Sequence, residues 1–146
     1  GAMGYGVPSG VAAKVALPDK FVVSVSGDGC FLMNGQEIST AIQYNLKILF
    51  IVFDNGMYGT IRMHQERDYP EHVYGTDLIN PDFAALARAY GLYSETINST
   101  EDIKDAVGRC IEKDVASLIH IKVDPEAITT RTTLTSIREN ALANSK

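Results

Sequence analysis

Two short polar turns hold the side chains of this sequence that could bind a charged ligand. The first is Gly27-Asp28-Gly29-Cys30, and the second begins at Asp54-Asn55-Gly56. Each follows an apolar run and places a side-chain oxygen beside glycine, which lets the backbone approach a ligand closely. Mg²⁺ prefers carboxylate, amide and carbonyl oxygens and usually completes its shell with water and phosphate oxygens. The two turns together indicate a magnesium site.

An anion site is expected beside the first turn. A helix is predicted to follow Gly29, and a helix N-terminus presents free N–H groups and the positive end of the helix dipole. A metal ion next to such a helix end favours a diphosphate ligand. Taken singly, each turn has a plainer explanation, with Asp28 as a helix N-cap and Asn55-Gly56 as a simple turn.

The elements around these turns alternate between strands and helices. Apolar runs predict four buried strands, at residues 21–26, 47–53, 92–97 and 116–123. Helical spacing predicts five helices, at residues 7–17, 32–45, 81–90, 101–113 and 132–144. This order predicts an α/β fold with a parallel sheet covered by helices on both faces. Ligands of such sheets bind outside the carboxyl ends of the strands, where both polar turns lie.

Residues 56–80 show no clear period and are expected to form a long irregular loop with a functional role. Within this loop, Arg62, Gln65 and Arg67 are expected on the surface.

The bulk properties exclude several classes of protein. A length of 146 residues favours a single domain, 1–146. The net charge of −5, without a basic run, argues against binding to nucleic acid or an anionic membrane. No stretch approaches the roughly 18 apolar residues that a membrane span needs. Two cysteines make no disulfide framework, so we expect a reduced, cytoplasmic setting.

The spacing of the two turns carries a family resemblance. The dinucleotide fingerprint fails because Leu32 stands where its third glycine belongs, and no phosphate-binding loop of the G-x-x-x-x-G-K-[ST] type occurs. Gly27-Asp28-Gly29, followed by 24 residues and then Asp54-Asn55, resembles the signature of thiamine diphosphate-dependent enzymes. "GAMGYGVPSGVAAK" and "NPDFAALARAYG" are similar to segments of the same family, in particular of acetolactate synthases. The match implies the C-terminal, diphosphate-binding domain of such an enzyme, with its thiamine diphosphate-binding fold.

The resemblance implies a metal site with three ligands. Asp28 and Asn55 would bind Mg²⁺ through their side chains, and Met57 through its backbone carbonyl. Gly29 and Cys30 would present backbone N–H groups to the diphosphate of thiamine diphosphate.

The resemblance also implies further contacts with the cofactor. The Gly1 carbonyl would meet the pyrimidine amine, and Met3 would lie beneath the bent cofactor. Gly1-Ala2-Met3 is either a remnant of tag removal or native sequence, and both alternatives stay open. The remaining cofactor-binding positions would be Gly27, Tyr58 and Gly59.

The family's catalytic glutamate is not expected in this chain. In the family it comes from the N-terminal, pyrimidine-binding domain of a neighbouring subunit, whereas this chain starts at the "GAMG" motif. The chain is therefore expected to be an inactive part of a longer or split enzyme. It would need that domain from the same or a partner chain, in a homodimer or homotetramer.

The resemblance implies a lyase or transferase that decarboxylates or carboligates 2-oxo acids. Acetolactate synthases carry a tryptophan nine residues past the metal-binding asparagine, but this chain has His64 there, which argues against strict acetolactate synthase activity. His64 is either a substrate contact or a solvated histidine. The alternative function is a non-catalytic α/β module that binds another Mg²⁺-nucleotide or diphosphate.

Overall fold

The chain folds into two compact units, as seen in a computed structural model that describes residues 1–144. The first unit contains Gly1–Asp54 and Asn80–Lys122. The second contains Asn55–Ile79 and the described residues from Val123 onward. Each unit has its own packing.

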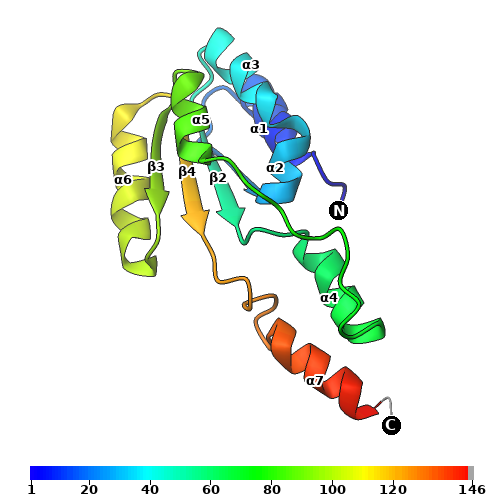
Figure 1. Cartoon of the computed structure of the whole chain (residues 1–146). Coiled ribbons are helices and arrows are strands. Elements are labelled where there is room, and N and C mark those ends of the chain that lie inside the picture. Colours follow the sequence, from blue (N-terminus) through cyan, green and yellow to red (C-terminus); the bar gives the residue numbers. More distant parts are fainter. Residues whose placement is uncertain (145–146) are drawn as a thin grey trace. The chain divides into compact units, whose positions relative to one another are not determined.

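A four-stranded parallel sheet forms the centre of the first unit (Figure 1). Its strands are β1 (Val22–Gly27), β2 (Ile48–Asp54), β3 (Tyr93–Ile97) and β4 (Ser117–Lys122). They lie in the order β1-β2-β4-β3, and each neighbouring pair is parallel. The predicted strands and the predicted parallel α/β fold are confirmed.

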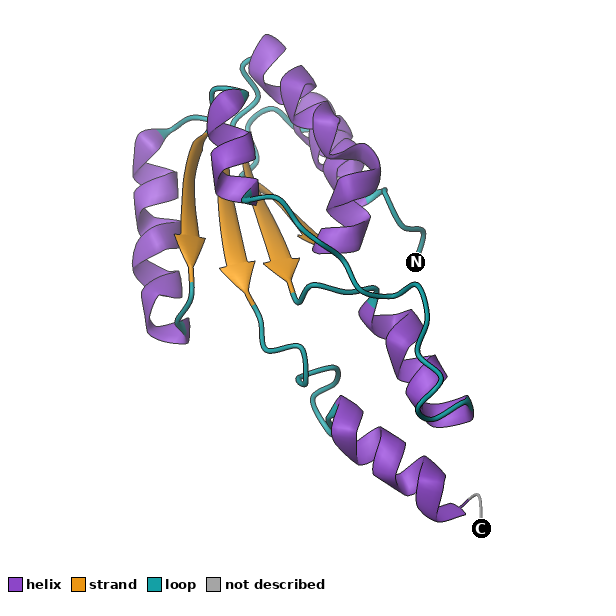
Figure 2. Cartoon of the chain, viewed as in Figure 1, coloured by secondary structure: helices purple, strands orange, loops and turns teal. Residues whose placement is uncertain are grey.

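The helices of the first unit connect these strands (Figure 2). They are α1 (Gly6–Ala16), α2 (Asp28–Asn34), α3 (Ile38–Gln43), α5 (Phe83–Ala89) and α6 (Ile103–Lys113), with short 3₁₀ turns at Gly35–Glu37 and Thr100–Asp102. The single helix predicted over 32–45 is wrong in detail, because it begins earlier and is interrupted at Gly35. A Cβ atom at Gly35 would lie 2.5 Å from the Phe31 ring, so only glycine allows the chain to pass so close to that ring.

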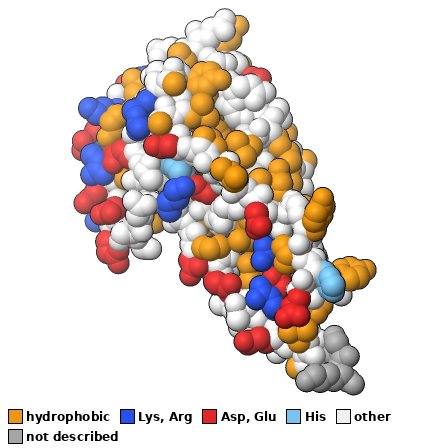
Figure 3. Space-filling model, in the orientation of Figure 1, with side chains coloured by type: hydrophobic (Ala, Val, Ile, Leu, Met, Phe, Trp, Pro, Cys, Tyr) orange, Lys and Arg blue, Asp and Glu red, His pale blue; other side chains and the backbone are white. Residues whose placement is uncertain are grey.

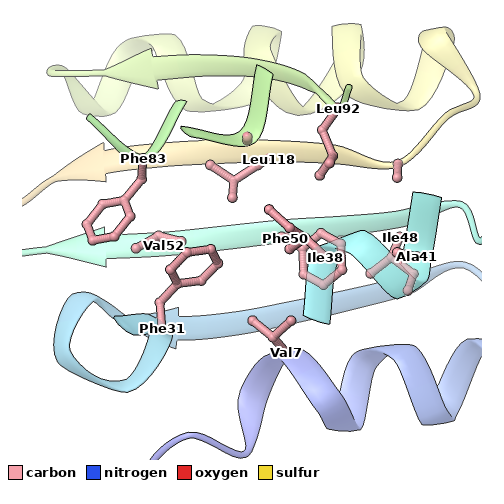
Figure 4. Packing of buried hydrophobic residues seen from close by; sticks show 12 residues of the cluster. Val7, Phe31, Ile38, Ala41, Ile48, Phe50, Val52, Phe83, Leu92 and Leu118 are labelled. Atoms are coloured by element: carbon pink, nitrogen blue, oxygen red, sulfur yellow. The ribbon is translucent and has the colours of Figure 1, made fainter. Parts of the chain in front are cut away.

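One face of the sheet carries the main core (Figure 4). Because side chains alternate along a strand, Ile48, Phe50 and Val52 of β2 all point to this face. They pack against helix residues such as Val7 and Phe31, and all five are at most 2% exposed.

Helix α1 approaches the sheet closely through two glycines. A Cβ atom at Gly6 would lie 2.2 Å from Ser26 Oγ, and one at Gly10 would lie 2.8 Å from Ser24 Cβ. Larger residues at these positions would push α1 away from β1.

The opposite face of the sheet is covered by α6 over β3, where Arg109 of α6 bonds Glu95 of β3 at 2.6 and 2.8 Å. On β1 and β2 the same face leaves Val23, Val25 and Phe53 exposed by 43%, 56% and 42%. On the face seen in Figure 3, acidic and basic side chains are interspersed over α6.

The second unit contains α4 (Gly59–Asp68) and α7 (Leu134–Asn144). The expectation of a long irregular loop over 56–80 is wrong for residues 59–68, which form α4. Arg62 and Gln65 are half-buried rather than simple surface residues, because Arg62 bonds Glu66 and Gln65 bonds the Tyr74 carbonyl. Arg67 is exposed, as predicted. No helix within residues 1–144 is long and apolar enough to cross a membrane.

Candidate cofactor site

Asp28 lies directly after the carboxyl end of β1, as the first residue of α2. Gly27 before it is extended, with φ −75° and ψ 161°, so the chain turns sharply from strand to helix between these two residues. The Asp28 side chain is buried and only 3% exposed. Its Oδ1 accepts a hydrogen bond from the Gly29 N–H at 2.8 Å, and its Oδ2 accepts one from Asn80 Nδ2 at 2.7 Å.

Asp54 occupies the matching position at the end of β2. Because Gly27 pairs with Phe53 across the two strands, Asp28 and Asp54 both lie one residue past the same pair. Asp54 is 4% exposed and accepts hydrogen bonds from Asn80 Nδ2 at 2.7 Å, His120 Nε2 at 2.8 Å and Lys122 Nζ at 2.5 Å. Asn80 therefore donates to two buried carboxylates at the ends of neighbouring strands.

The surroundings of Asp54 favour its ionised form. Burial alone would raise the pKa of Asp54, but hydrogen bonds from Lys122, His120 and Asn80 outweigh burial and hold that pKa well below its ordinary value. Hydrogen bonds to a carboxylate stabilise its charged form, and Lys122 adds a positive charge.

The N-terminal "GAMG" segment is held against α2. The Gly4 N–H donates to Cys30 Sγ at 3.2 Å, and Asn34 Nδ2 donates to the Gly4 carbonyl at 3.0 Å. Gly4 is buried with φ +74°, a conformation that favours glycine. Gly1 and Met3, which precede it, are exposed. The segment predicted to contact the cofactor thus lies next to the Gly27–Cys30 turn.

The second half of the predicted metal site begins at Asn55, the residue after Asp54, and belongs to the second unit. Asn55 Oδ1 accepts a hydrogen bond from the Met57 N–H at 3.2 Å. The Met57 carbonyl accepts one from the Gly59 N–H at 3.0 Å. Both predicted oxygen ligands have a second lone pair left for a metal ion.

Backbone pairing fixes the turn around Met57. Met57 forms an antiparallel bridge with Asp77, and the Tyr58 N–H donates to the Thr76 carbonyl at 2.8 Å. Gly59 opens α4 in a tight place, since a Cβ atom there would lie 2.7 Å from Ile128 Cδ1. The predicted positions Met57, Tyr58 and Gly59 therefore belong to one ordered turn of the second unit.

His64, the predicted alternative substrate contact, is exposed on α4.

Sequence reasoning missed three members of the network around Asp54, namely Asn80, His120 and Lys122. The helix predicted over 81–90 begins at Phe83, with Asp82 as its N-cap, and Asn80 lies before it. His120 and Lys122 stand two residues apart on β4 and point to the same face, so strand alternation was a usable signal for them. No spacing rule pointed to Asn80.

The residues present fit a Mg²⁺ ion chemically. Asp28 offers a carboxylate, Asn55 an amide oxygen and Met57 a backbone carbonyl, which are the hard oxygen donors that Mg²⁺ prefers. Among residues 1–144, no three His, Cys, Asp or Glu side chains are arranged to hold a metal. The predicted donor set needs only one carboxylate, so it does not depend on such a cluster.

Comparison with known proteins gives one family and several relatives. Residues 1–121 match the family described as thiamine pyrophosphate enzyme, C-terminal TPP binding domain. A probable acetolactate synthase large subunit of Methanococcus aeolicus is 36% identical over 128 residues, which are 87% of this chain and 21% of that protein. The acetolactate synthase isozyme 2 large subunit of Escherichia coli K12 is 36% identical over 125 residues, or 85% of this chain and 23% of that protein. The 3D-(3,5/4)-trihydroxycyclohexane-1,2-dione hydrolase of Bacillus subtilis 168 is 37% identical over 134 residues, which are 87% of this chain and 21% of that protein.

Proposed function

Since this chain belongs to the thiamine pyrophosphate enzymes and corresponds to their C-terminal TPP binding domain, we propose that it binds the diphosphate of thiamine pyrophosphate (thiamine diphosphate) through Mg²⁺. The observation that carries this proposal is the buried Asp28 carboxylate at the end of β1, tied by Asn80 to the end of the neighbouring strand β2. Asn55, the proposed second ligand, directly follows Asp54, the last residue of β2.

The proposed role of each residue follows from its chemistry. Asp28, Asn55 and the Met57 carbonyl hold Mg²⁺, while Gly29 and Cys30 offer N–H groups to the diphosphate. Gly27, Tyr58 and Gly59 shape the two turns. Thiamine diphosphate, when bound, supplies the electron sink for carbon–carbon bond chemistry next to a carbonyl group.

The N-terminal segment is proposed to contact the organic part of the cofactor. Gly1 would accept a hydrogen bond through its carbonyl, and Met3 would give apolar contact. The support for both is that Gly4 fixes this segment to Cys30 and Asn34, beside the proposed diphosphate contacts.

The chain spans about one fifth of the length of the curated relatives it matches. We propose that the whole protein is a lyase or transferase, similar to acetolactate synthase, that acts on a 2-oxo acid. A pyrimidine-binding domain of the same or a partner chain would supply the catalytic glutamate, in a homodimer or homotetramer. His64 is a candidate substrate contact, and the cytoplasmic setting stays a prediction.

Calorimetry on the complete protein that carries this chain tests the proposal. Thiamine diphosphate should bind in the presence of Mg²⁺ and lose most of its affinity in excess EDTA. ADP with Mg²⁺ serves as the comparison ligand, since it has a diphosphate but no thiazolium or aminopyrimidine. Preference for ADP, or binding of thiamine diphosphate that ignores Mg²⁺, would favour the alternative of a nucleotide or diphosphate module.

A further inference from the structure

The Asn80 side chain bonds both Asp28 and Asp54. Its Nδ2 lies 2.7 Å from Asp28 Oδ2 and 2.7 Å from Asp54 Oδ1. An amide NH₂ group has two protons, so each carboxylate can receive one of them. The donor capacity of Asn80 is thus used completely by two carboxylates from neighbouring strand ends.

The orientation of the Asn80 amide follows from charge. With the amide flipped, Oδ1 would face two carboxylates and meet only acceptors. The orientation seen leaves Asn80 Oδ1 buried without a hydrogen-bond partner among the described residues. Buried polar atoms are usually paired, so the unpaired Oδ1 atom is a cost of the arrangement in which the Asn80 NH₂ group bridges the two acids.

Asp54 gives Asn80 a fixed anchor. His120 and Lys122 donate to Asp54 Oδ2 from β4, while Asn80 donates to Oδ1. His120 is in turn held by the Phe83 ring, which meets it edge-on at a centroid distance of 5.1 Å. Hydrogen bonds and packing therefore hold the Asp54 carboxylate from several sides, and Asn80 transmits that fixed position to Asp28.

Asp28 needs such a support for the role proposed above. Mg²⁺ demands near-ideal octahedral geometry, whereas Ca²⁺ tolerates flexible sites with longer bonds. A carboxylate that can rotate would therefore lose affinity for Mg²⁺ more than for Ca²⁺. Partners that orient metal ligands commonly contribute about 10–100-fold to metal affinity.

We propose that Asn80 is a positioning residue that fixes the Asp28 carboxylate for Mg²⁺ by bridging it to Asp54. This inference rests on the proposed function of Asp28 as a metal ligand. Asn80 itself does not need to touch the metal or the cofactor. Its effect is to raise the affinity of the site for Mg²⁺ relative to its affinity for Ca²⁺.

The test measures the affinities of the complete protein for Mg²⁺ and Ca²⁺, each titrated by calorimetry with thiamine diphosphate saturating. Asn80→Ala should weaken Mg²⁺ binding by about 10-fold or more, in line with other ligand-orienting residues. Ca²⁺ binding should weaken clearly less, so that the ratio of the two affinities shifts toward Ca²⁺. Asn98→Ala is the matched control, because Asn98 is exposed and follows the end of β3 in the same unit.

Asn80→Gln keeps the NH₂ donor on a longer side chain and covers the case in which the alanine variant fails to fold. It should restore part of the preference for Mg²⁺ over Ca²⁺. An unchanged affinity ratio in the folded Asn80 variants would overturn the proposal, whether both affinities stay the same or fall together. If instead the parent protein and Asn98→Ala show no Mg²⁺-dependent binding of the cofactor, the proposed function itself fails. Cofactor binding by the parent protein therefore distinguishes a failure of the positioning role of Asn80 from a failure of the proposed function.

Discussion

Glu66 and Arg138 lie 72 residues apart in the sequence and are joined by two hydrogen bonds of 2.5 and 2.7 Å. Arg62 adds a third, from its Nε to Glu66 Oε1 at 3.0 Å. Glu66 is fully buried, and these bonds connect α4 with α7 in the second unit. A buried charge is tolerated when it is paired and hydrogen-bonded, so this cluster is a main contact between the two helices.

The pairing makes the stability of this contact depend on pH. Hydrogen bonds from Arg138, opposed by burial and helped by Arg62, lower the pKa of Glu66 from 4.5 to about 2. Because the folded-state pKa is depressed, the stabilisation is complete above about pH 4.5 and is lost as the pH falls toward 2. A shift of this size corresponds to about 3 kcal/mol in the free energy of unfolding.

Glu66→Gln should therefore lower the free energy of unfolding by about 3 kcal/mol at pH 7, and the gap to the parent should narrow below about pH 4.5. Urea unfolding followed by circular dichroism at several pH values measures both effects. Glu139→Gln is the control, since Glu139 is exposed on α7, next to Arg138. A gap that stays constant between pH 7 and pH 3 would show that the Glu66 charge does not stabilise the fold.

Asp28→Asn should abolish Mg²⁺-dependent binding of thiamine diphosphate while the fold is kept. The substitution removes the charge but preserves the size of a side chain that is only 3% exposed. Asparagine is a better test than alanine, because alanine would leave one Asn80 proton without an acceptor. Calorimetry with Mg²⁺ and thiamine diphosphate, with the exposed Asp19→Asn as control, gives the readout. Binding equal to that of the parent would remove Asp28 from the metal site.

The sequence predicted the elements with strong periodicity and missed those that depend on distant contacts. All four strands and the helix α1 lie within about two residues of their predicted positions, because apolar runs and helical spacing are local signals. Helix α4 was missed because its buried side is made by Glu66, a charged residue whose burial is made possible by hydrogen bonds from Arg62 and Arg138. A pattern search that counts charged residues as exposed cannot find such a helix.

The sequence likewise predicted only part of the candidate site. The Gly27–Cys30 and Asp54–Gly59 turns stand at strand ends, and the sequence marks strand ends well. Asn80 joins Asp28 over 52 residues and Asp54 over 26 residues, and nothing near Asn80 in the sequence specifies these partners. The sequence therefore predicted the turns that carry the proposed ligands, but not the hydrogen-bond network around Asp28 and Asp54.

Two glycines in helices should respond to alanine with opposite signs. At Gly10 in α1 a Cβ atom would lie 2.8 Å from Ser24 Cβ, so Gly10→Ala should destabilise the first unit by about 1–3 kcal/mol through overpacking. At Gly108 in α6 nothing lies within 4 Å, so Gly108→Ala should stabilise by about 0.5–1 kcal/mol through helix propensity. Urea unfolding of both variants measures the difference. Equal effects of one sign would contradict the close packing of α1 on β1.

Amide hydrogen exchange should divide the segment from Tyr58 to Thr76 into a protected helix and an open turn. Arg62 and Tyr69 donate their N–H groups to the Tyr58 and Gln65 carbonyls at 2.9 and 2.8 Å, so α4 should exchange slowly. Residues 71–75 should exchange fast, because they are mostly exposed, and Glu71 and Gly75 have φ values of +67° and +68°.

The side-chain hydrogen bonds of Gln65 allow the backbone pairing next to α4 to be perturbed by a single substitution. Gln65 Nε2 donates to the Tyr74 carbonyl at 2.8 Å, and Gln65 Oε1 accepts a hydrogen bond from Thr76 Oγ1 at 3.3 Å. The Thr76 carbonyl in turn accepts the Tyr58 N–H, so Gln65→Ala should speed exchange at Tyr58, while the exposed Thr60→Ala should not. Mass spectrometry or NMR of the exchanged amides reads both variants. Uniformly fast exchange from Tyr58 to Thr76 in the parent protein would mean that α4 is not stably formed, and the turn that carries Met57 would then lack its support.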